Sequence, residues 1–219
     1  MKIPRASSPR PRGFTLIELL VSVGIFMVVM LITIGALVGM ADADRKAQSI
    51  QAVVDNLNFA LDDMSRNIRT GMTYHCVENG IDPGGEPIGN LSLTSNCGFN
   101  GSSYMAFEGA GGSSSNPNDQ IVYWFAPAAT CGPGYTGGCI EKSVNSGQTF
   151  LPLTSPQVFI DSLRFYVTGT CPLTSGSGCA PDSLQPKAVI VLSAHIQLTA
   201  QTKTTIELQT TVTQRIFDQ

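Results

Sequence analysis

One carboxylate, Glu18, lies inside an otherwise apolar run of the sequence, and this run begins directly after a possible cleavage point. Burying a carboxylate in hydrocarbon costs roughly 2.5–3.5 kcal/mol even on a lenient insertion scale, so an ionisable residue there indicates a function. If the chain is cut between Gly13 and Phe14, the new α-amine is positively charged near neutral pH. That amine would lie within one helical turn of Glu18, and it could neutralise the same carboxylate on a neighbouring chain. The alternative is that Glu18 only extends toward the membrane interface.

The element that positions Glu18 is the 27-residue run from Phe14 to Met40, in which Glu18 is the one ionisable side chain. At about 1.5 Å per residue, a helix of this length can cross the roughly 30 Å hydrocarbon core of a bilayer. Basic residues precede the run, and Asp42 and Asp44 follow it, so the positive-inside rule predicts a cytoplasmic N-terminus and an exported remainder. A conventional secretory signal peptide fits poorly, because its apolar region usually has about 7–15 residues.

The segment Gly13-Phe14-Thr15-Leu16-Ile17-Glu18, followed by a continuous apolar helix, resembles the class III signal of type IV pilins and type II secretion pseudopilins. In that superfamily a membrane-embedded aspartyl prepilin peptidase cuts after the glycine and methylates the new N-terminal residue. The resemblance implies that residues 1–13 are a cleaved basic leader, that Phe14 is the N-methylated residue, and that Glu18 is the assembly carboxylate.

The same resemblance implies partners and a location. The partners would be the prepilin peptidase, an inner-membrane assembly platform, and other pilin or pseudopilin subunits bound through the N-terminal helix. The chain would be a single-pass protein of the bacterial inner membrane, with residues 14–40 as the transmembrane helix, the leader in the cytoplasm and the head in the periplasm. After assembly it would belong to a surface filament or a periplasmic pseudopilus.

Beyond the apolar run, residues 41–70 predict an amphipathic continuation of the helix into the head. No Pro or Gly interrupts the segment before Gly71, which predicts a helix end near Thr70. Asp62 and Arg66, four residues apart, are expected on the side away from the core. Apolar residues recur at spacings of three and four and predict one buried stripe: Ile50, Val53, Val54, Leu57, Leu61, Met64 and Ile68.

Residues 71–219 predict an extracytoplasmic, β-rich globular head. Short alternating segments are separated by clusters of Gly, Pro, Ser and Asn. The last two segments predict an antiparallel hairpin with a tight turn at Ala200–Gln201, one face on the amphipathic helix and one face in water. The expected fold class is α+β, a long N-terminal helix packed on an antiparallel sheet with disulfide-stapled loops, which again resembles the pilin superfamily. The predicted strands are Tyr104–Phe107, Gln120–Ala126, Phe159–Thr168, Ala188–Thr199 and Thr202–Thr213.

The six cysteines all follow the apolar run, which is typical of an exported domain in an oxidising compartment. Several pairings are possible, and proximity in the sequence favours Cys76–Cys97, Cys131–Cys139 and Cys171–Cys179. A zinc site is not expected, because the Cys-x7-Cys spacing is not that of zinc ligands.

No catalytic constellation is found in the sequence. It contains no Gly-x-Ser-x-Gly, no Gly-Lys-Ser/Thr phosphate loop and no His-Glu-x-x-His. His75 beside Cys76 is interpreted as a surface histidine, and His195 as a solvent-facing strand residue. Asp119 and Asp161 are single acids near strand ends, and a calcium site needs several oxygens from one loop. The chain is therefore predicted not to be an enzyme and to have no cofactor or metal site.

The charge distribution argues against nucleic acid as a partner. The whole chain has 13 basic and 16 acidic residues, and four of the basic residues lie within residues 1–13. Removing that leader leaves nine basic against 16 acidic residues, a net charge of -7. A protein that binds DNA by counterion release needs clustered Lys and Arg, which the remainder lacks.

These features together predict a structural subunit of a type IV pilus or a type II secretion pseudopilus, a minor pilin or pseudopilin that helps to initiate or cap filament assembly. The sizeable head and the helix ending Ser65-Arg66-Asn67-Ile68-Arg69 resemble the PilW-like and J-type pseudopilin group. An alternative function remains open, in which the head is a pilus-associated adhesin or a DNA-uptake module anchored by the same helix.

Overall fold

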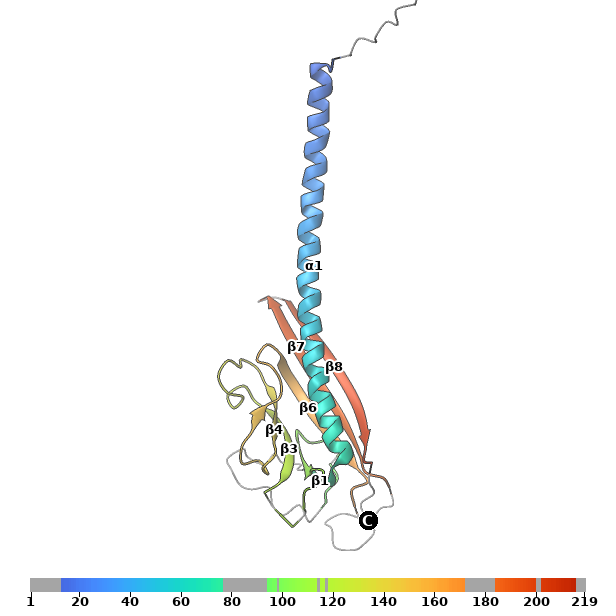
Figure 1. Cartoon of the computed structure of the whole chain (residues 1–219), viewed down its shortest axis with the longest axis vertical. Helices are drawn as coiled ribbons and strands as arrows, with labels where there is room; N and C mark the ends of the chain where they lie inside the picture. The colour runs from blue at the N-terminus through green and yellow to red at the C-terminus, as the bar shows by residue number, and fades with distance from the viewer. Residues whose placement is uncertain are drawn as a thin grey trace, which may run out of the picture. The chain divides into compact units, whose positions relative to one another are not determined.

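The computed structural model describes residues 13–76, 94–97, 99–113, 115–116, 118–171, 184–199 and 202–215. These residues form one long helix, α1 (Leu16–Thr70), and β-strands labelled β1 to β8 in chain order (Figure 1). The chain divides into two compact units, residues 1–48 and 49–219, which are described separately below. The fold class is α+β, as the sequence predicts.

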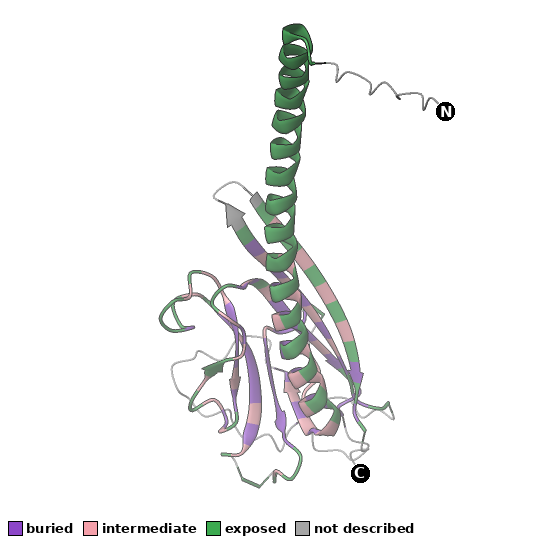
Figure 2. Ribbon diagram, turned by 45° about the horizontal axis from the view of Figure 1, so that its top comes forward, coloured by how far each residue is buried: buried purple, intermediate pink, exposed green. Residues whose placement is uncertain are grey.

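In the first unit, α1 is solvent-exposed on every side. Each residue from 13 to 49 is exposed, and Figure 2 shows this segment in a single colour. Within the described part of the chain, α1 is the one helix long and apolar enough to cross a membrane, by length and composition. Apolar side chains that cover all faces of a helix are typical of a membrane span rather than of a helix on the surface of a globular protein.

In the second unit, the remainder of α1 buries one stripe of side chains. Val53, Leu57, Met64 and Ile68 are each at most 3% exposed, which confirms these members of the predicted stripe. Ala60, which was not part of the predicted stripe, is also fully buried, while Ile50, Val54 and Leu61 are partly buried.

The helix ends at Thr70, as predicted, and the next residue needs to be glycine. A Cβ on Gly71 would lie 2.4 Å from a ring carbon of Phe107, so this close approach leaves no room for a side chain. The Gly71 N–H donates to the Ile68 carbonyl at 3.2 Å and closes the last turn.

The strands form two antiparallel sheets rather than the single sheet that the sequence predicts. One sheet has the order β1-β2-β3-β4-β5, and the other has the order β6-β7-β8. Figure 1 shows the C-terminal part of α1 lying along the β6-β7-β8 sheet. The strands are β1 (Met72–Cys76), β2 (Tyr104–Glu108), β3 (Gln120–Ala126), β4 (Cys139–Ser143), β5 (Leu151–Pro152), β6 (Phe159–Thr168), β7 (Lys187–Thr199) and β8 (Thr202–Thr213).

All five predicted strands are present, and three of them have the predicted bounds. The other two, β2 and β7, are each one residue longer. Strands β1, β4 and β5 were not predicted: β5 has two residues, and β1 and β4 are short strands that contain polar and disulfide-bonded residues. The predicted turn at Ala200–Gln201 lies outside the described residues.

The predicted β7–β8 hairpin is confirmed, and its inner face is part of the core. Ile190, Leu192, Ala194 and Ile196 of β7 are at most 5% exposed and belong to the same hydrophobic cluster as the α1 stripe. In β8, Ile206 and Leu208 are partly buried and pack against that cluster. Alternation along β7 therefore places every second side chain against the helix.

The five-stranded sheet is buried on both faces in its centre. Met105 and Phe107 of β2 belong to the cluster under α1, whereas Tyr104 and Ala106 belong to a second cluster on the other face, together with Trp124. This is why β2 shows no exposed position. A strand buried on both faces shows no apolar–polar alternation.

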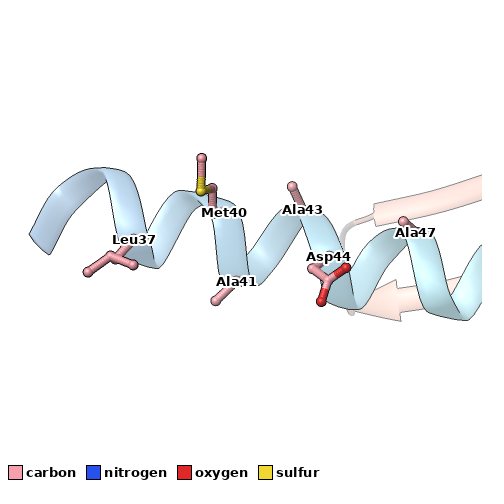
Figure 3. Close-up of a pocket in the computed structure, with 6 residues that line it drawn as sticks. All are labelled: Leu37, Met40, Ala41, Ala43, Asp44 and Ala47. Carbon is pink, nitrogen blue, oxygen red and sulfur yellow. The ribbon is translucent and has the colours of Figure 1, made fainter. Parts of the chain in front are cut away.

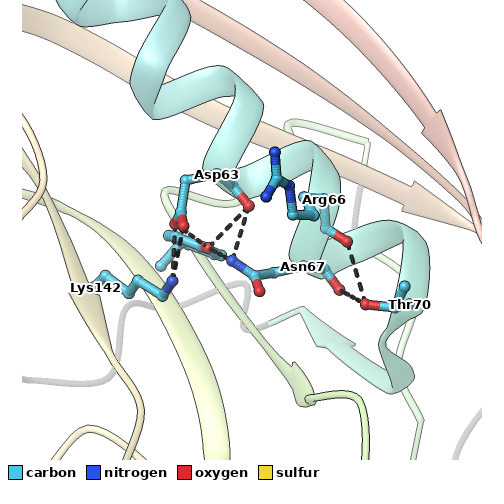
Figure 4. Close-up of polar contacts among 6 residues, drawn as sticks. Asp63, Arg66, Asn67, Thr70 and Lys142 are labelled. Carbon is cyan, nitrogen blue, oxygen red and sulfur yellow. Dashed lines mark hydrogen bonds and ion pairs between the residues drawn. The ribbon is translucent and has the colours of Figure 1, made fainter.

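A polar network fixes α1 to this sheet (Figure 4). The Lys142 ammonium lies 2.9 and 3.0 Å from the two carboxylate oxygens of Asp63. The hydroxyl of Tyr123 donates to Asp63 at 2.6 Å and accepts from the Asn67 amide at 2.7 Å. Burial and the neighbouring Asp63 raise the pKa of Tyr123 well above its usual range, so the phenol keeps its proton and acts as a donor.

Candidate functional site

The candidate site is the segment around Gly13 where α1 begins. Residues 13–15 are not helical, and α1 starts at Leu16. The Glu18 N–H donates to the Thr15 hydroxyl at 3.3 Å, and the Leu19 N–H donates to the Thr15 carbonyl at 3.2 Å. Thr15 is therefore the N-cap residue of α1.

The spacing of Thr15 and Glu18 gives Glu18 a second, local role. A Thr followed three residues later by Glu is the sequence pattern of a capping box. A carboxylate in the first turn also interacts favourably with the helix dipole, by about 0.3–1 kcal/mol at an exposed site. The capping role of Thr15 was not predicted, although the Thr-x-x-Glu spacing would have identified it.

Among the residues that the structure describes, none requires glycine at position 13. A Cβ built on Gly13 would have no heavy atom within 4 Å, and the next side chain, Phe14, is 83% exposed. The Gly13–Phe14 peptide bond therefore lies in an open, non-helical stretch. A glycine that the fold does not need is explained if another protein recognises this bond.

The polar side chains of the apolar run find partners within α1. The Ser22 hydroxyl donates to the Leu19 carbonyl at 2.9 Å, and the Thr33 hydroxyl donates to the Val29 carbonyl at 2.8 Å. Such internal bonds meet the requirement of a lipid environment, which offers no hydrogen-bonding solvent. Glu18 is the one charged side chain of the run, and no ion pair joins it to a cationic group among the described residues.

Where the apolar run gives way to polar residues, α1 has a shallow hollow (Figure 3). Ligand sites usually combine an apolar cleft with several converging polar groups. Here one charged residue, Asp44, contributes, and its carboxylate already accepts a bond from Gln48 at 3.1 Å. This hollow is therefore not a candidate ligand site. Its described lining residues are Leu37, Met40, Ala41, Ala43, Asp44 and Ala47.

Comparison with known proteins identifies the same segment. The family model described as the prokaryotic N-terminal methylation motif matches residues 9–34. The chain has a type IV pilin-like, class III signal. The match includes Gly13, Phe14 and Glu18, and the signal together with the apolar helix that follows fits a single-pass, membrane-anchored pilin. No curated protein and no solved structure matches the chain.

The pilin-like signal belongs to a family of structural rather than enzymatic proteins. It indicates assembly with other pilin subunits and processing by a prepilin peptidase.

Two of the three predicted disulfides are present, Cys76–Cys97 and Cys131–Cys139. Cys171 is also disulfide-bonded, and its predicted partner Cys179 lies outside the described residues. The Cys76–Cys97 bond removes the Cys76 thiol, so the pair His75 and Cys76 has no nucleophilic sulfur.

The two histidines differ from their predicted settings. His75 lies in β1 and is half-buried rather than on the surface. His195 is also half-buried, with Nδ1 2.8 Å from the Asp161 carboxylate and its ring stacked on Phe159 at 5.0 Å. Asp161 also lies 3.6 Å from the Lys203 ammonium, so both partners that these ion pairs give it are basic. These partners come from β7 and β8, and the pairing of β6 with β7 was not predicted from the sequence.

Proposed function

We propose that this chain is a minor pilin or pseudopilin, a structural subunit of a type IV pilus or a type II secretion pseudopilus that helps to initiate or cap filament assembly. The observation that supports this proposal best is the methylation-motif match over residues 9–34, which coincides with a fully exposed apolar helix. The exposed apolar surface can be covered by lipid before assembly and by other N-terminal helices after it.

In this proposal the prepilin peptidase removes residues 1–13 and methylates Phe14. The open geometry of the Gly13–Phe14 bond supports access of a peptidase to it. The head then lies on the periplasmic side of the bacterial inner membrane, anchored by residues 14–40, and the assembly platform acts on this anchor. The size of the head favours the PilW-like and J-type pseudopilin group.

Mass spectrometry of the membrane-extracted protein tests the processing step. The expected mature chain begins at Phe14 and has one added N-terminal methyl group. A Gly13→Val variant should retain the leader, and a Gly24→Ala variant, altered at an open position inside the helix, should be processed normally. A wild-type product that begins at Met1, or beyond the apolar run, would refute the proposal.

The charge of Glu18 is proposed to act in assembly by pairing with the Phe14 amine of a neighbouring subunit. Because Glu18 also has a place in the helix cap, the two roles must be separated. Glu18→Gln removes the charge and keeps a capping side chain, whereas Thr15→Ala removes the cap and keeps the charge. Assembly through charge predicts that Glu18→Gln is absent from sheared filaments and that Thr15→Ala is incorporated.

The amount of each variant in sheared filaments and in membranes, measured by immunoblot, decides between these roles. Equal incorporation of Glu18→Gln and wild type would exclude the charge pairing. Loss of Thr15→Ala alone would assign the segment to helix capping. Both variants should be present in membranes at wild-type levels, which shows that a loss from filaments is a loss of assembly.

A further inference from the structure

The stretch that leads into β2 contains an asparagine followed directly by a glycine, Asn100–Gly101. Phe99 and Asn100 form a turn, and both side chains are exposed. At such a pair the asparagine side chain is readily attacked by the next backbone nitrogen, because glycine has no side chain that hinders the approach. The chain has one other such pair, Asn79–Gly80, which lies outside the described residues.

The packing of the head requires glycine at position 101. Gly101 has a φ of +66°, a conformation that residues with a side chain rarely adopt. A Cβ there would lie 2.8 Å from a ring carbon of Tyr166 and 2.9 Å from the Phe165 carbonyl oxygen, so no side chain fits. Gly101 is therefore buried and fixed in place, while Asn100 beside it is open to water.

The Gly101 nitrogen makes no backbone hydrogen bond among the described residues, which leaves it available for reaction. Other asparagines of the head have side chains that are held by hydrogen bonds. The Thr170 N–H donates to Oδ1 of Asn96 at 3.1 Å. The Thr149 N–H donates to Oδ1 of Asn145 at 3.0 Å. Neither of these asparagines is followed by glycine, so Asn100 differs from both in sequence and in setting.

We propose that Asn100 is a site of spontaneous deamidation in the folded chain. The Gly101 nitrogen gives up its proton to water and bonds to Cγ of Asn100, which closes a succinimide ring. The side-chain nitrogen takes up a proton and leaves as ammonia. Water then opens the ring at either carbonyl and gives aspartate or isoaspartate. The net reaction consumes one water and releases one ammonia, with no oxidation or reduction.

Formation of isoaspartate would disturb the link between this stretch and β6. The Ser102 N–H donates to the Phe165 carbonyl at 2.9 Å, and the Phe165 N–H donates to the Ser102 carbonyl at 2.7 Å. This isolated bridge joins the stretch before β2 to a strand of the other sheet. Isoaspartate adds one carbon to the backbone directly before Gly101, which has no space to move. The modified chain is therefore expected to be less stable.

The test uses the full chain in a neutral detergent, kept at mildly alkaline pH and sampled over several days. Peptide mapping by mass spectrometry, with a digestion that separates Asn79 from Asn100, follows the replacement of the amide by a carboxyl group. We expect Asn100 to be converted to isoaspartate and aspartate, while Asn96 and Asn145 stay intact. The melting temperature should fall as conversion proceeds. The inference concerns only the head and does not depend on the proposed role in a filament.

Three variants separate the steps of this inference. Asn100→Gln keeps the amide, but its longer side chain closes a ring much less readily, so this variant should stay unmodified and keep its melting temperature. Asn79→Gln removes the other Asn-Gly pair and should leave the conversion of Asn100 unchanged. Asn100→Asp introduces the charge without the extra backbone carbon and should, before incubation, melt at the wild-type temperature.

The unfolded chain in urea is the reference for the reaction. If Asn100 stays intact in the folded chain and is converted in urea, the fold protects this position and the proposal is wrong. If Asn100 stays intact in both, the proposal is equally overturned. Conversion of Asn100 with no change in melting temperature would contradict the predicted weakening of the bridge between Ser102 and Phe165.

Discussion

At the scale of single residues, the head depends on a few half-buried charges that long-range contacts compensate. Asp63 accepts bonds from Lys142 and Tyr123, whereas its neighbour Asp62 is exposed and makes no ion pair among the described residues. Hydrogen bonds to charged groups contribute about 1.5–3 kcal/mol each, more than neutral ones do. The position of a carboxylate, rather than its type, thus determines its effect on stability.

Asp63→Ala is expected to lower the free energy of unfolding by about 1–3 kcal/mol, because it leaves Lys142 and the buried Tyr123 hydroxyl without their acceptor. Asp62→Ala is the matched control, since it makes the same change one position away on an exposed site. Urea denaturation of both variants measures the difference. Equal stability of the two would show that the network does not stabilise the head.

A second prediction concerns pH. Burial raises the pKa of Glu141, which is 4% exposed in β4. The folded chain then holds this proton more tightly than the unfolded chain, whose glutamate pKa is about 4.3, so the contribution of Glu141 to stability falls as pH rises from there through the folded pKa. Glu141→Gln should therefore stabilise the protein at neutral pH.

The gain in Glu141→Gln should be small at pH 4 and larger at pH 7, as measured by the urea midpoint at each pH. Glu207→Gln, at an exposed position of β8, should show no such change. A gain in Glu141→Gln that is the same at both pH values would contradict the assignment of the effect to ionisation.

At the scale of elements, α1 is one continuous helix with two different surroundings. Residues 16–49 are exposed on all sides, while the later part has one buried stripe and one exposed side. Helix propensity and the absence of proline account for the continuity, and the distribution of apolar residues accounts for the difference.

Leu57→Ala is expected to destabilise the head by about 2–5 kcal/mol, because Leu57 is fully buried and its removal leaves a cavity in the core. Phe59→Ala removes a larger side chain from the same helix, yet Phe59 is 62% exposed. Its loss should change the free energy of unfolding by less than about 0.5 kcal/mol. Chemical denaturation in detergent compares the two, and a larger effect of Phe59→Ala would contradict the packing described here.

At the scale of the whole molecule, the disulfides join segments that differ in their distance along the chain. Cys76 and Cys97 are separated by 21 positions and link β1 to the stretch before β2, whereas Cys131 and Cys139 are separated by 8 positions. In the chain-entropy model a longer closed loop removes more freedom from the unfolded state, with about 3 kcal/mol for 15 residues.

Replacing Cys76 and Cys97 by serine is therefore expected to lower stability by about 3 kcal/mol, and replacing Cys131 and Cys139 by somewhat less. Thermal unfolding of the two double variants under non-reducing conditions gives the order. The opposite order would indicate that local packing around Cys131 and Cys139 outweighs chain entropy.

Part of the fold could be predicted from the sequence because it depends on local patterns. The apolar run, the end of α1 before Gly71, and the β7–β8 hairpin follow from residue types and periodicity within one segment. Strand β2 was predicted one residue short, and β4, with Glu141 and Lys142 inside a five-residue strand, was missed because its pattern is not that of a strand. The division into two sheets was also missed, since strand order does not follow from periodicity.

By itself, the sequence determined the pilin-like signal, the helix long and apolar enough to cross a membrane, and the buried stripe, because a motif and a helical period are properties of neighbouring residues. Only the tertiary structure decided which polar residues meet. Asp63 and Lys142 are 79 positions apart, His195 and Asp161 are 34 apart, and Glu108 meets Gln120 through strand register. Such pairs form when the core closes and brings distant segments to one place, and no local pattern encodes that closure.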